Sequence, residues 1–73
     1  MAEAPLPRFM SVDDVAEELA VSRAVVYSTL KSGVLPAIQV GPKNIWRIER
    51  RVFEEYIEAR YAETRERRER GEI

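Results

Sequence analysis

The sequence predicts a small, mostly α-helical domain with three helices and one two-stranded β-hairpin. Apolar side chains recur with the helical period in two short segments within residues 11–32, and again from about residue 50. Between these segments, two short runs rich in β-branched residues, 37–40 and 45–48, flank four turn-forming residues. The chain has 73 residues, which leaves room for one domain.

Residues 1–10 are expected to form an extended N-terminal arm, because Pro5 and Pro7 disfavour a helix there. Phe9 or Met10 should pack onto the core, since a hydrophobic residue just before a helix N-cap often does so.

The first helix is predicted from Ser11 to Ala20. Ser11 can cap its N-terminus, and Asp14 can reach back to the backbone amide of Ser11. The apolar residues fall on one face of this helix: Val12, Val15, Ala16 and Leu19.

A second helix is predicted from Arg23 to Lys31 or Ser32. Ser22 can act as its N-cap, and Gly33 stands where a left-handed C-cap is needed. Two short helices joined by a tight turn form a helix-turn-helix pattern.

The hairpin follows Leu35-Pro36, which ends the second helix. Its strands are joined by residues 41–44, and Trp46 should face the core together with Ile48, which leaves Arg47 pointing away from them.

The third helix should begin near Arg50. Its apolar stripe comprises Val52, Phe53, Tyr56, Ile57 and Tyr61. Residues 62–73 are expected to form a charged, helical C-terminal tail that is solvated and frays beyond Tyr61. Opposite charges four residues apart offer weak ion pairs in that tail, Glu63–Arg67, Arg65–Glu69 and Glu66–Arg70.

The net charge of −1 conceals an uneven distribution. Residues 1–19 carry one basic and five acidic residues, residues 20–51 carry six basic and one acidic, and residues 52–73 carry five basic and seven acidic. A basic centre between acidic flanks is what a small nucleic-acid-binding protein needs if only one face meets phosphate.

Several functional classes are disfavoured. The chain has no cysteine and no histidine, so it lacks a disulfide, the commonest metal ligand and the usual general base. Helix-end capping explains Asp13 and Asp14 without any chemistry. No apolar stretch is long enough to span a membrane, and the N-terminal segment lacks the apolar core of a signal peptide. We expect no enzyme, no cofactor, no metal and no membrane partner.

The order helix, turn, helix, hairpin, helix is that of a winged helix-turn-helix. Three groups of residues carry a more specific likeness: Val21-Ser22-Arg23 with Val26-Tyr27, Ser32-Gly33 with Leu35-Pro36-Ala37, and Val40-Gly41 with Trp46-Arg47-Ile48. On these residues, the segment 9–61 resembles the excisionase-like helix-turn-helix family. That family belongs to the MerR-like winged-helix group, which includes the small BldC-type regulators of actinobacteria.

The chain departs from the family pattern at several positions. Ala20 stands where glycine is usual, so the turn between the first two helices could be rearranged. Basic residues are common where Ser28 and Gln39 stand, and the hairpin tip is slightly longer than in many members. The dimer-forming coiled coil and effector domain of larger MerR regulators are absent from the sequence, so we expect no small-molecule effector.

The resemblance implies that the second helix enters the DNA major groove while the hairpin, or wing, contacts the backbone or minor groove. The expected DNA-binding residues are Ser22, Arg23, Ala24, Tyr27, Ser28 and Lys31 on the second helix, Lys43, Asn44 and Arg47 on the wing, and Arg50 at the start of the third helix.

The function expected is that of a sequence-preferring double-stranded DNA-binding protein, a bacterial transcriptional regulator or nucleoid-associated factor in the cytoplasm. Two alternatives stay open: a phage-type excisionase that directs recombination, and a protein-interaction adaptor that uses exposed apolar residues such as Val34 or Ile45. The partners expected are double-stranded DNA and, because one such module should bind weakly, further copies of the chain on adjacent repeats.

Overall fold

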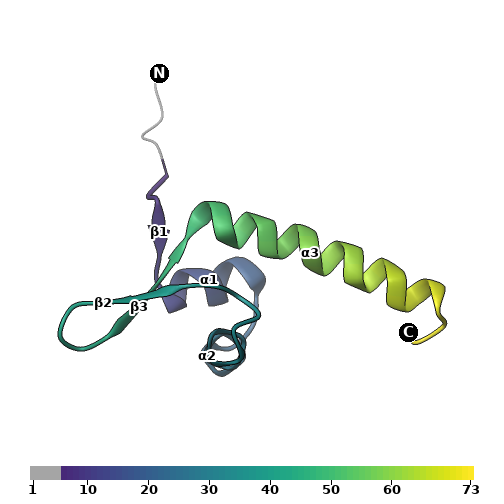
Figure 1. Ribbon diagram of the computed structural model, residues 1–73, viewed down its shortest axis with the longest axis horizontal. Coiled ribbons are helices and arrows are strands. Elements are labelled where there is room, and N and C mark those ends of the chain that lie inside the picture. The colour runs from purple at the N-terminus through teal and green to yellow at the C-terminus, as the bar shows by residue number, and fades with distance from the viewer. Residues whose placement is uncertain (1–5) are drawn as a thin grey trace, which may run out of the picture.

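The computed structural model describes residues 6–73, so the part of the predicted arm that includes Pro5 lies outside the described residues. The elements follow in the order β1 (Phe9–Met10), α1 (Val12–Leu19), α2 (Arg23–Ser32), β2 (Ile38–Val40), β3 (Ile45–Glu49) and α3 (Arg50–Glu69). Figure 1 shows α2 below the strands, the β2–β3 hairpin projecting to one side and α3 to the other. The predicted mostly α winged helix-turn-helix architecture, with three helices and an antiparallel hairpin, is confirmed.

The N-terminus of α1 is fixed by the predicted capping box. The backbone N–H of Asp14 donates to the Ser11 hydroxyl over 3.0 Å, and the Ser11 N–H donates to the Asp14 carboxylate over 3.0 Å. These two bonds satisfy amide groups that a helix start would otherwise leave without partners.

The turn between α1 and α2 keeps a left-handed residue even though that residue is alanine. Ala20 has φ 56° and ψ 44°. Its N–H donates to the carbonyl of Glu17, and the N–H of Val21 donates to the carbonyl of Ala16 over 3.0 Å, the paired bonds of a Schellman motif. The suggested rearrangement of this turn is therefore wrong, because these bonds hold Ala20 in a conformation that costs about 1–2 kcal/mol for a residue with a Cβ.

Helix α2 begins and ends as its caps predict. The Ser22 hydroxyl accepts a hydrogen bond from the backbone N–H of Val25 over 3.3 Å. Gly33 ends the helix with φ 82°, and the N–H of Leu35 then donates to the carbonyl of Thr29, which folds the following loop back onto the helix.

The sheet has three strands in the order β1-β3-β2, all antiparallel. The hairpin β2–β3 was predicted, but β1 was not. Met10 of β1 pairs with Ile48 and is buried, which confirms the predicted packing of this segment, whereas Phe9 remains partly exposed.

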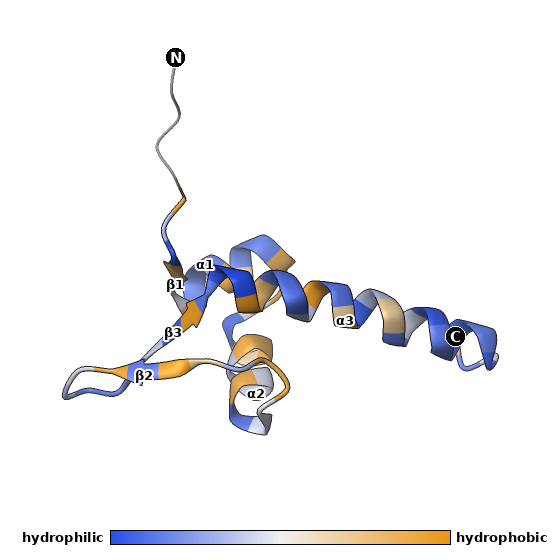
Figure 2. Ribbon diagram, turned by 45° about the horizontal axis from the view of Figure 1, so that its top comes forward, coloured by the Kyte–Doolittle hydropathy of each residue, from blue (hydrophilic) through white to orange (hydrophobic). Residues whose placement is uncertain are grey.

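The two faces of the hairpin differ. Directly opposite residues of an antiparallel pair share a face, so Ile38 lies beside Arg47 and Val40 beside Ile45. These apolar side chains are exposed, with 50% of the surface of Ile38 accessible, and Figure 2 shows the hydrophobic colour of β2 on the projecting hairpin. Trp46 packs partly buried against the core, as predicted.

The core lies where α1, α2, the sheet and the first turns of α3 meet. It consists of Met10, Val12, Val15, Ala16, Val26, Leu30, Leu35, Ile48 and Phe53. Its small size makes each large side chain important for stability.

Helix α3 continues to Glu69, so the predicted fraying beyond Tyr61 is wrong. Residues 61–73 are all exposed, and Figure 2 shows this projecting part as largely hydrophilic. Tyr61 is 67% exposed and does not extend the apolar stripe. The helix persists without core contacts because arginine, glutamate and alanine are good helix formers.

The ion pairs of this segment differ from the three that were expected. Those found are Arg60–Glu63, Arg67–Glu72 and Arg70–Glu72. The last two connect the end of α3 to the chain that turns back at Gly71, so they act on the helix terminus rather than along its face.

Within residues 6–73, none of the helices combines the length and the apolar character needed to cross a lipid bilayer.

Candidate nucleic-acid interface

A hollow of about 470 Å³ opens between the start of α1, the first turns of α2 and the wing. Its lining residues are Ser11, Val12, Asp13, Arg23, Tyr27, Lys43, Asn44, Ile45, Trp46 and Arg47. Three of these side chains are cationic, and Asp13 is the one carboxylate among the described residues that line the hollow. The structure therefore brings Arg23, Lys43 and Arg47 to a single site.

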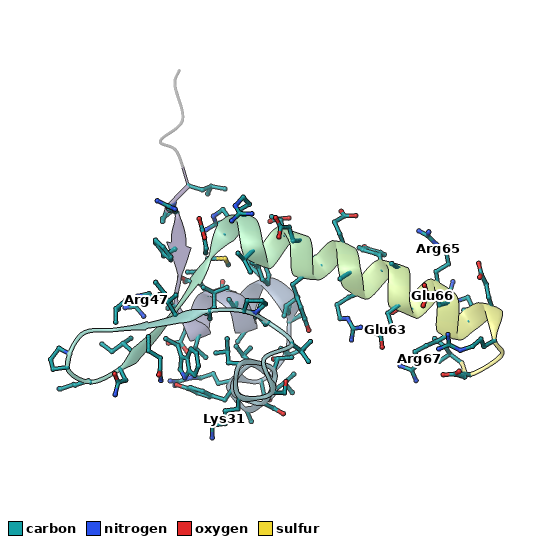
Figure 3. The ribbon with its side chains drawn as sticks, in the orientation of Figure 1. Lys31, Arg47, Glu63, Arg65, Glu66 and Arg67 are labelled. Carbon is teal, nitrogen blue, oxygen red and sulfur yellow. The ribbon has the colours of Figure 1, made fainter. Side chains whose placement is uncertain are left out.

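A second, shallower hollow lies along the exposed face of α2. It is lined by Ala24, Tyr27, Ser28, Lys31 and Ser32. Tyr27 lines both hollows, so the two form one surface that runs from the wing tip to the end of α2. We call the side chains of these two hollows the basic surface. Figure 3 shows Arg47 on the hairpin and Lys31 on α2.

Eight of the ten expected DNA-binding residues lie on the basic surface: Arg23, Ala24, Tyr27, Ser28, Lys31, Lys43, Asn44 and Arg47. Tyr27 is half-buried and packs against the core, so its backbone position is well defined. This placement is typical of an amphipathic tyrosine, which can pack against the core and also line a surface site.

Ser22 is not among the residues that line the basic surface. Its hydroxyl is engaged as the N-cap of α2, where it accepts the hydrogen bond from Val25. Its place in the structure is thus explained by the start of the helix.

Arg47 lies at the edge of the basic surface. It leaves β3 from the face that also carries Ile38, and its Nη1 donates to the carbonyl of Trp46 over 2.7 Å. It lines both the 470 Å³ hollow and a smaller one of about 200 Å³ on the outer face of the sheet, which Phe9 and Ile38 also line.

Arg50 lines neither hollow of the basic surface. Its backbone N–H donates to the carbonyl of Arg8 over 2.7 Å, and its side-chain Nε donates to the carbonyl of Pro7 over 3.0 Å. Arg50 therefore holds the N-terminal segment against the start of α3.

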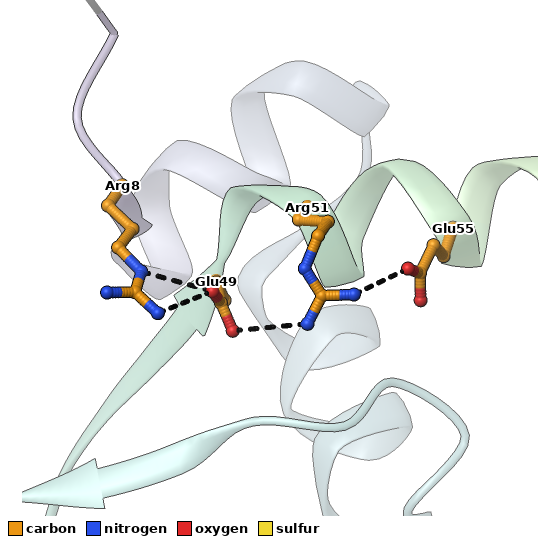
Figure 4. Close-up of polar contacts among 4 residues, drawn as sticks. All are labelled: Arg8, Glu49, Arg51 and Glu55. Carbon is orange, nitrogen blue, oxygen red and sulfur yellow. Dashed lines mark hydrogen bonds and ion pairs between the residues drawn. The ribbon is translucent and has the colours of Figure 1, made fainter.

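Figure 4 shows a network of charged side chains formed by Arg8, Glu49, Arg51 and Glu55. Glu49 contacts Arg8 on one side and Arg51 on the other, and Arg51 also pairs with Glu55 over 2.7 Å. This network lies at the junction of β1, β3 and α3, where both Arg8 and Arg51 have an acidic partner.

The site also contains an ion pair that sequence reasoning missed. Arg23 Nε lies 2.9 Å from the Asp13 carboxylate oxygen, and both side chains are exposed, at 63% and 70%. The sequence shows an acid at the start of one helix and an arginine at the start of the next. Only the packing of α1 against α2 brings the two together.

The Asp14 carboxylate beside this pair stays ionised more readily than an ordinary aspartate. The hydrogen bond from the Ser11 backbone N–H holds the pKa of Asp14 below its ordinary value, and the bond with the Ser11 hydroxyl acts in the same direction. The positive charges of Arg50 and Arg47 lower this pKa further. The surroundings of Asp14 are thus those of a helix-capping carboxylate.

Among residues 6–73, no group of three or more potential metal-ligating side chains comes together. The arrangement has a different chemical character: cationic and polar donors spread over a helix and a neighbouring β-loop.

Comparison with known proteins agrees with this geometry. A family model described as a helix-turn-helix domain matches residues 9–61, which span α1, α2, the wing and the first half of α3. No curated protein and no solved structure matches the chain significantly. The chain therefore belongs to the helix-turn-helix domain family and is a small DNA-binding domain.

Proposed function

We propose that this protein is a sequence-preferring, non-catalytic binder of double-stranded DNA that inserts α2 into the major groove and lays its wing along the neighbouring backbone or minor groove. The observation that carries this proposal is the basic surface, in which one helix and one β-loop present their cationic side chains together. An α-helix fits the major groove, and the residues at its N-terminal end reach the base edges.

Each part of the basic surface has a distinct task in this proposal. Arg23, the first residue of α2, reaches a guanine edge or a phosphate. Lys43 and Asn44 at the wing tip follow the backbone or enter the minor groove, where basic side chains are attracted. Lys31 near the end of α2 contacts a phosphate and so sets the position of the helix without reading sequence.

The biological role proposed is transcriptional regulation or nucleoid-type coverage of DNA in the bacterial cytoplasm. Because one small module makes few contacts, useful affinity requires several copies on adjacent repeats. An excisionase role uses the same contacts, and an integrase gene beside the gene for this protein would favour it over regulation.

The proposal is tested by titrating fluorescently labelled duplex DNA at several salt concentrations. The basic surface carries Arg23, Lys31, Lys43 and Arg47, so the log–log dependence of affinity on salt should have a slope of about −3 to −5 per bound monomer. A matched control combines Arg65→Ala with Arg68→Ala on the projecting part of α3, which removes two arginines outside the basic surface and should leave the slope unchanged. Binding at low salt no tighter than that of an inert acidic protein of the same size would overturn the proposal.

A second candidate function is a protein-interaction adaptor, and one observation favours it. The outer face of the hairpin exposes Ile38, Val40 and Ile45 side by side, and Val34 is also exposed. Grouped apolar side chains on a small domain are a common feature of protein interfaces. This function would be favoured if the folded protein failed to bind any duplex.

A further inference from the structure

Asp13 places a negative charge on a surface whose other charged side chains are cationic and would attract a polyanion. It lines the 470 Å³ hollow beside three cationic side chains and contacts the first residue of α2 directly. Both partners are well exposed, and exposed ion pairs add little to folding stability. The contact between Asp13 and Arg23 therefore contributes little to the stability of the fold. Its position in the hollow suggests instead that it affects which ligand groups Arg23 can bind.

The ion pair involves one edge of the Arg23 guanidinium. Asp13 meets Nε, on the side of the guanidinium, at 2.9 Å. An arginine has five N–H donors in a rigid planar fork. A side-on contact through Nε leaves the two N–H groups at the end of the fork directed away from the carboxylate, and this end matches the N7 and O6 acceptors of guanine.

We propose that Asp13 is a positioning residue that makes Arg23 read a guanine edge in preference to a phosphate. This inference rests on the proposed function. The carboxylate fixes the orientation of the guanidinium before DNA arrives, so that less side-chain freedom is lost on binding. Its negative charge also repels a phosphate approaching the same arginine, whereas an uncharged base edge is not repelled in this way. Asp13 thus lowers the affinity for DNA of any sequence and raises discrimination between sequences.

The experiment begins with selection of tight-binding duplexes from a random pool by the wild-type protein. Affinities for the selected duplex and for a scrambled duplex of equal length are then measured for the wild type, Asp13→Asn, Arg23→Ala and the double variant. Glu18→Gln is the matched control, because it removes one negative charge from the exposed side of α1 away from the basic surface. Thermal unfolding of each variant verifies that it is folded, and Asp13→Ser replaces Asp13→Asn if the latter is not.

The expected result is a change in the ratio of the two affinities. Asp13→Asn should bind the scrambled duplex several-fold more tightly than the wild type, and the preference for the selected duplex should fall by about tenfold. Glu18→Gln should tighten both affinities equally, since it changes only overall charge. In the Arg23→Ala background, loss of Asp13 should no longer change the preference. Replacing the contacted guanine with 7-deazaguanine should weaken the wild type more than Asp13→Asn.

Two results would overturn the inference while the proposed function stands. One is an unchanged preference in Asp13→Asn with affinities that match those of Glu18→Gln. The other is a loss of preference that persists equally in the Arg23→Ala background, which would show that Asp13 does not act through Arg23. A wild-type protein that binds no duplex would overturn the proposed function itself, and the inference with it.

Discussion

Arg8 and Glu49 lie 41 residues apart in the sequence and form a two-point contact, with Nε and Nη2 of the arginine 3.1 and 3.0 Å from the same carboxylate oxygen. The contact joins the segment before β1 to the end of β3, beside the pairing of Met10 with Ile48. It adds a side-chain contact to the backbone pairing of β1 with β3.

Glu49→Gln should loosen this junction without unfolding the protein. Because Arg8 is largely exposed, the loss of unfolding free energy should be no more than about 1 kcal/mol and should shrink at high salt. Hydrogen exchange of the Arg50 amide, which donates to the carbonyl of Arg8, should become faster. Unchanged exchange of that amide would show that β1 is held by its backbone pairing and side-chain packing alone.

Ala20→Gly should stabilise the protein. Ala20 is held at φ 56°, where a Cβ costs about 1–2 kcal/mol and glycine is free of that cost, although glycine also gains entropy in the unfolded chain. The net gain expected in urea denaturation is about 1 kcal/mol. A decrease in stability would mean that the methyl group of Ala20 contributes packing that outweighs its backbone strain.

Because the core is small, alanine substitution should reduce stability very differently at two aromatic residues of α3. Phe53 is buried, so Phe53→Ala should cost about 3–5 kcal/mol, enough to unfold much of a domain of this size. Tyr61→Ala removes an exposed ring and should change stability by no more than about 0.5 kcal/mol. Comparable losses in urea denaturation would contradict the finding that the apolar stripe of α3 ends before Tyr61.

Acid should weaken the capping box of α1. The pKa of Asp14 lies below its ordinary value of 3.8 in the folded protein, so its stabilising effect is complete above that value and is lost as the pH falls through the lowered pKa. Asp14→Asn should be less stable than the wild type at neutral pH, and the difference should narrow with acidification. If the stability difference between the wild type and Asp14→Asn stayed constant as the pH fell through the pKa of Asp14, the charge of Asp14 would have no part in its stabilising effect.

Alanine variants can distinguish the contribution of the basic surface to DNA binding from that of Arg50 at the start of α3. Arg23→Ala and Arg47→Ala should each weaken DNA binding and reduce the salt slope by about one, with no loss of fold. Arg50→Ala should leave the salt slope unchanged, because Arg50 binds the carbonyl of Pro7 instead of lining the basic surface. Normal DNA affinity in both of the first two variants would refute the assignment of the surface.

The sequence was sufficient for the elements whose signals are local. Ser11 with Asp14, Ser22 and Gly33 mark the ends of α1 and α2, and the turn residues before Ile45 define the hairpin. Strand β1 could not be found in this way, because two residues show no period and their partner strand is distant in sequence.

The other differences between the sequence-based predictions and the structure arose from the directions of side chains and from the packing of distant elements. Arg50 follows the wing in sequence, but the start of α3 turns its side chain toward the N-terminal segment. Asp13 and Arg23 meet only because α1 packs against α2. Fraying was predicted beyond Tyr61 because the apolar stripe was expected to end there, whereas local helix propensity continues α3 to Glu69.

The most direct test of the central claim is to record amide NMR spectra of isotope-labelled protein during titration with duplex DNA. If α2 and the wing form the DNA-binding surface, the largest shift changes fall on residues 23–31 and 43–47, while residues 61–73 and the strand residues 38–40 change little. Changes concentrated on residues 61–73 or on strand residues 38–40, with α2 unaffected, would contradict the account.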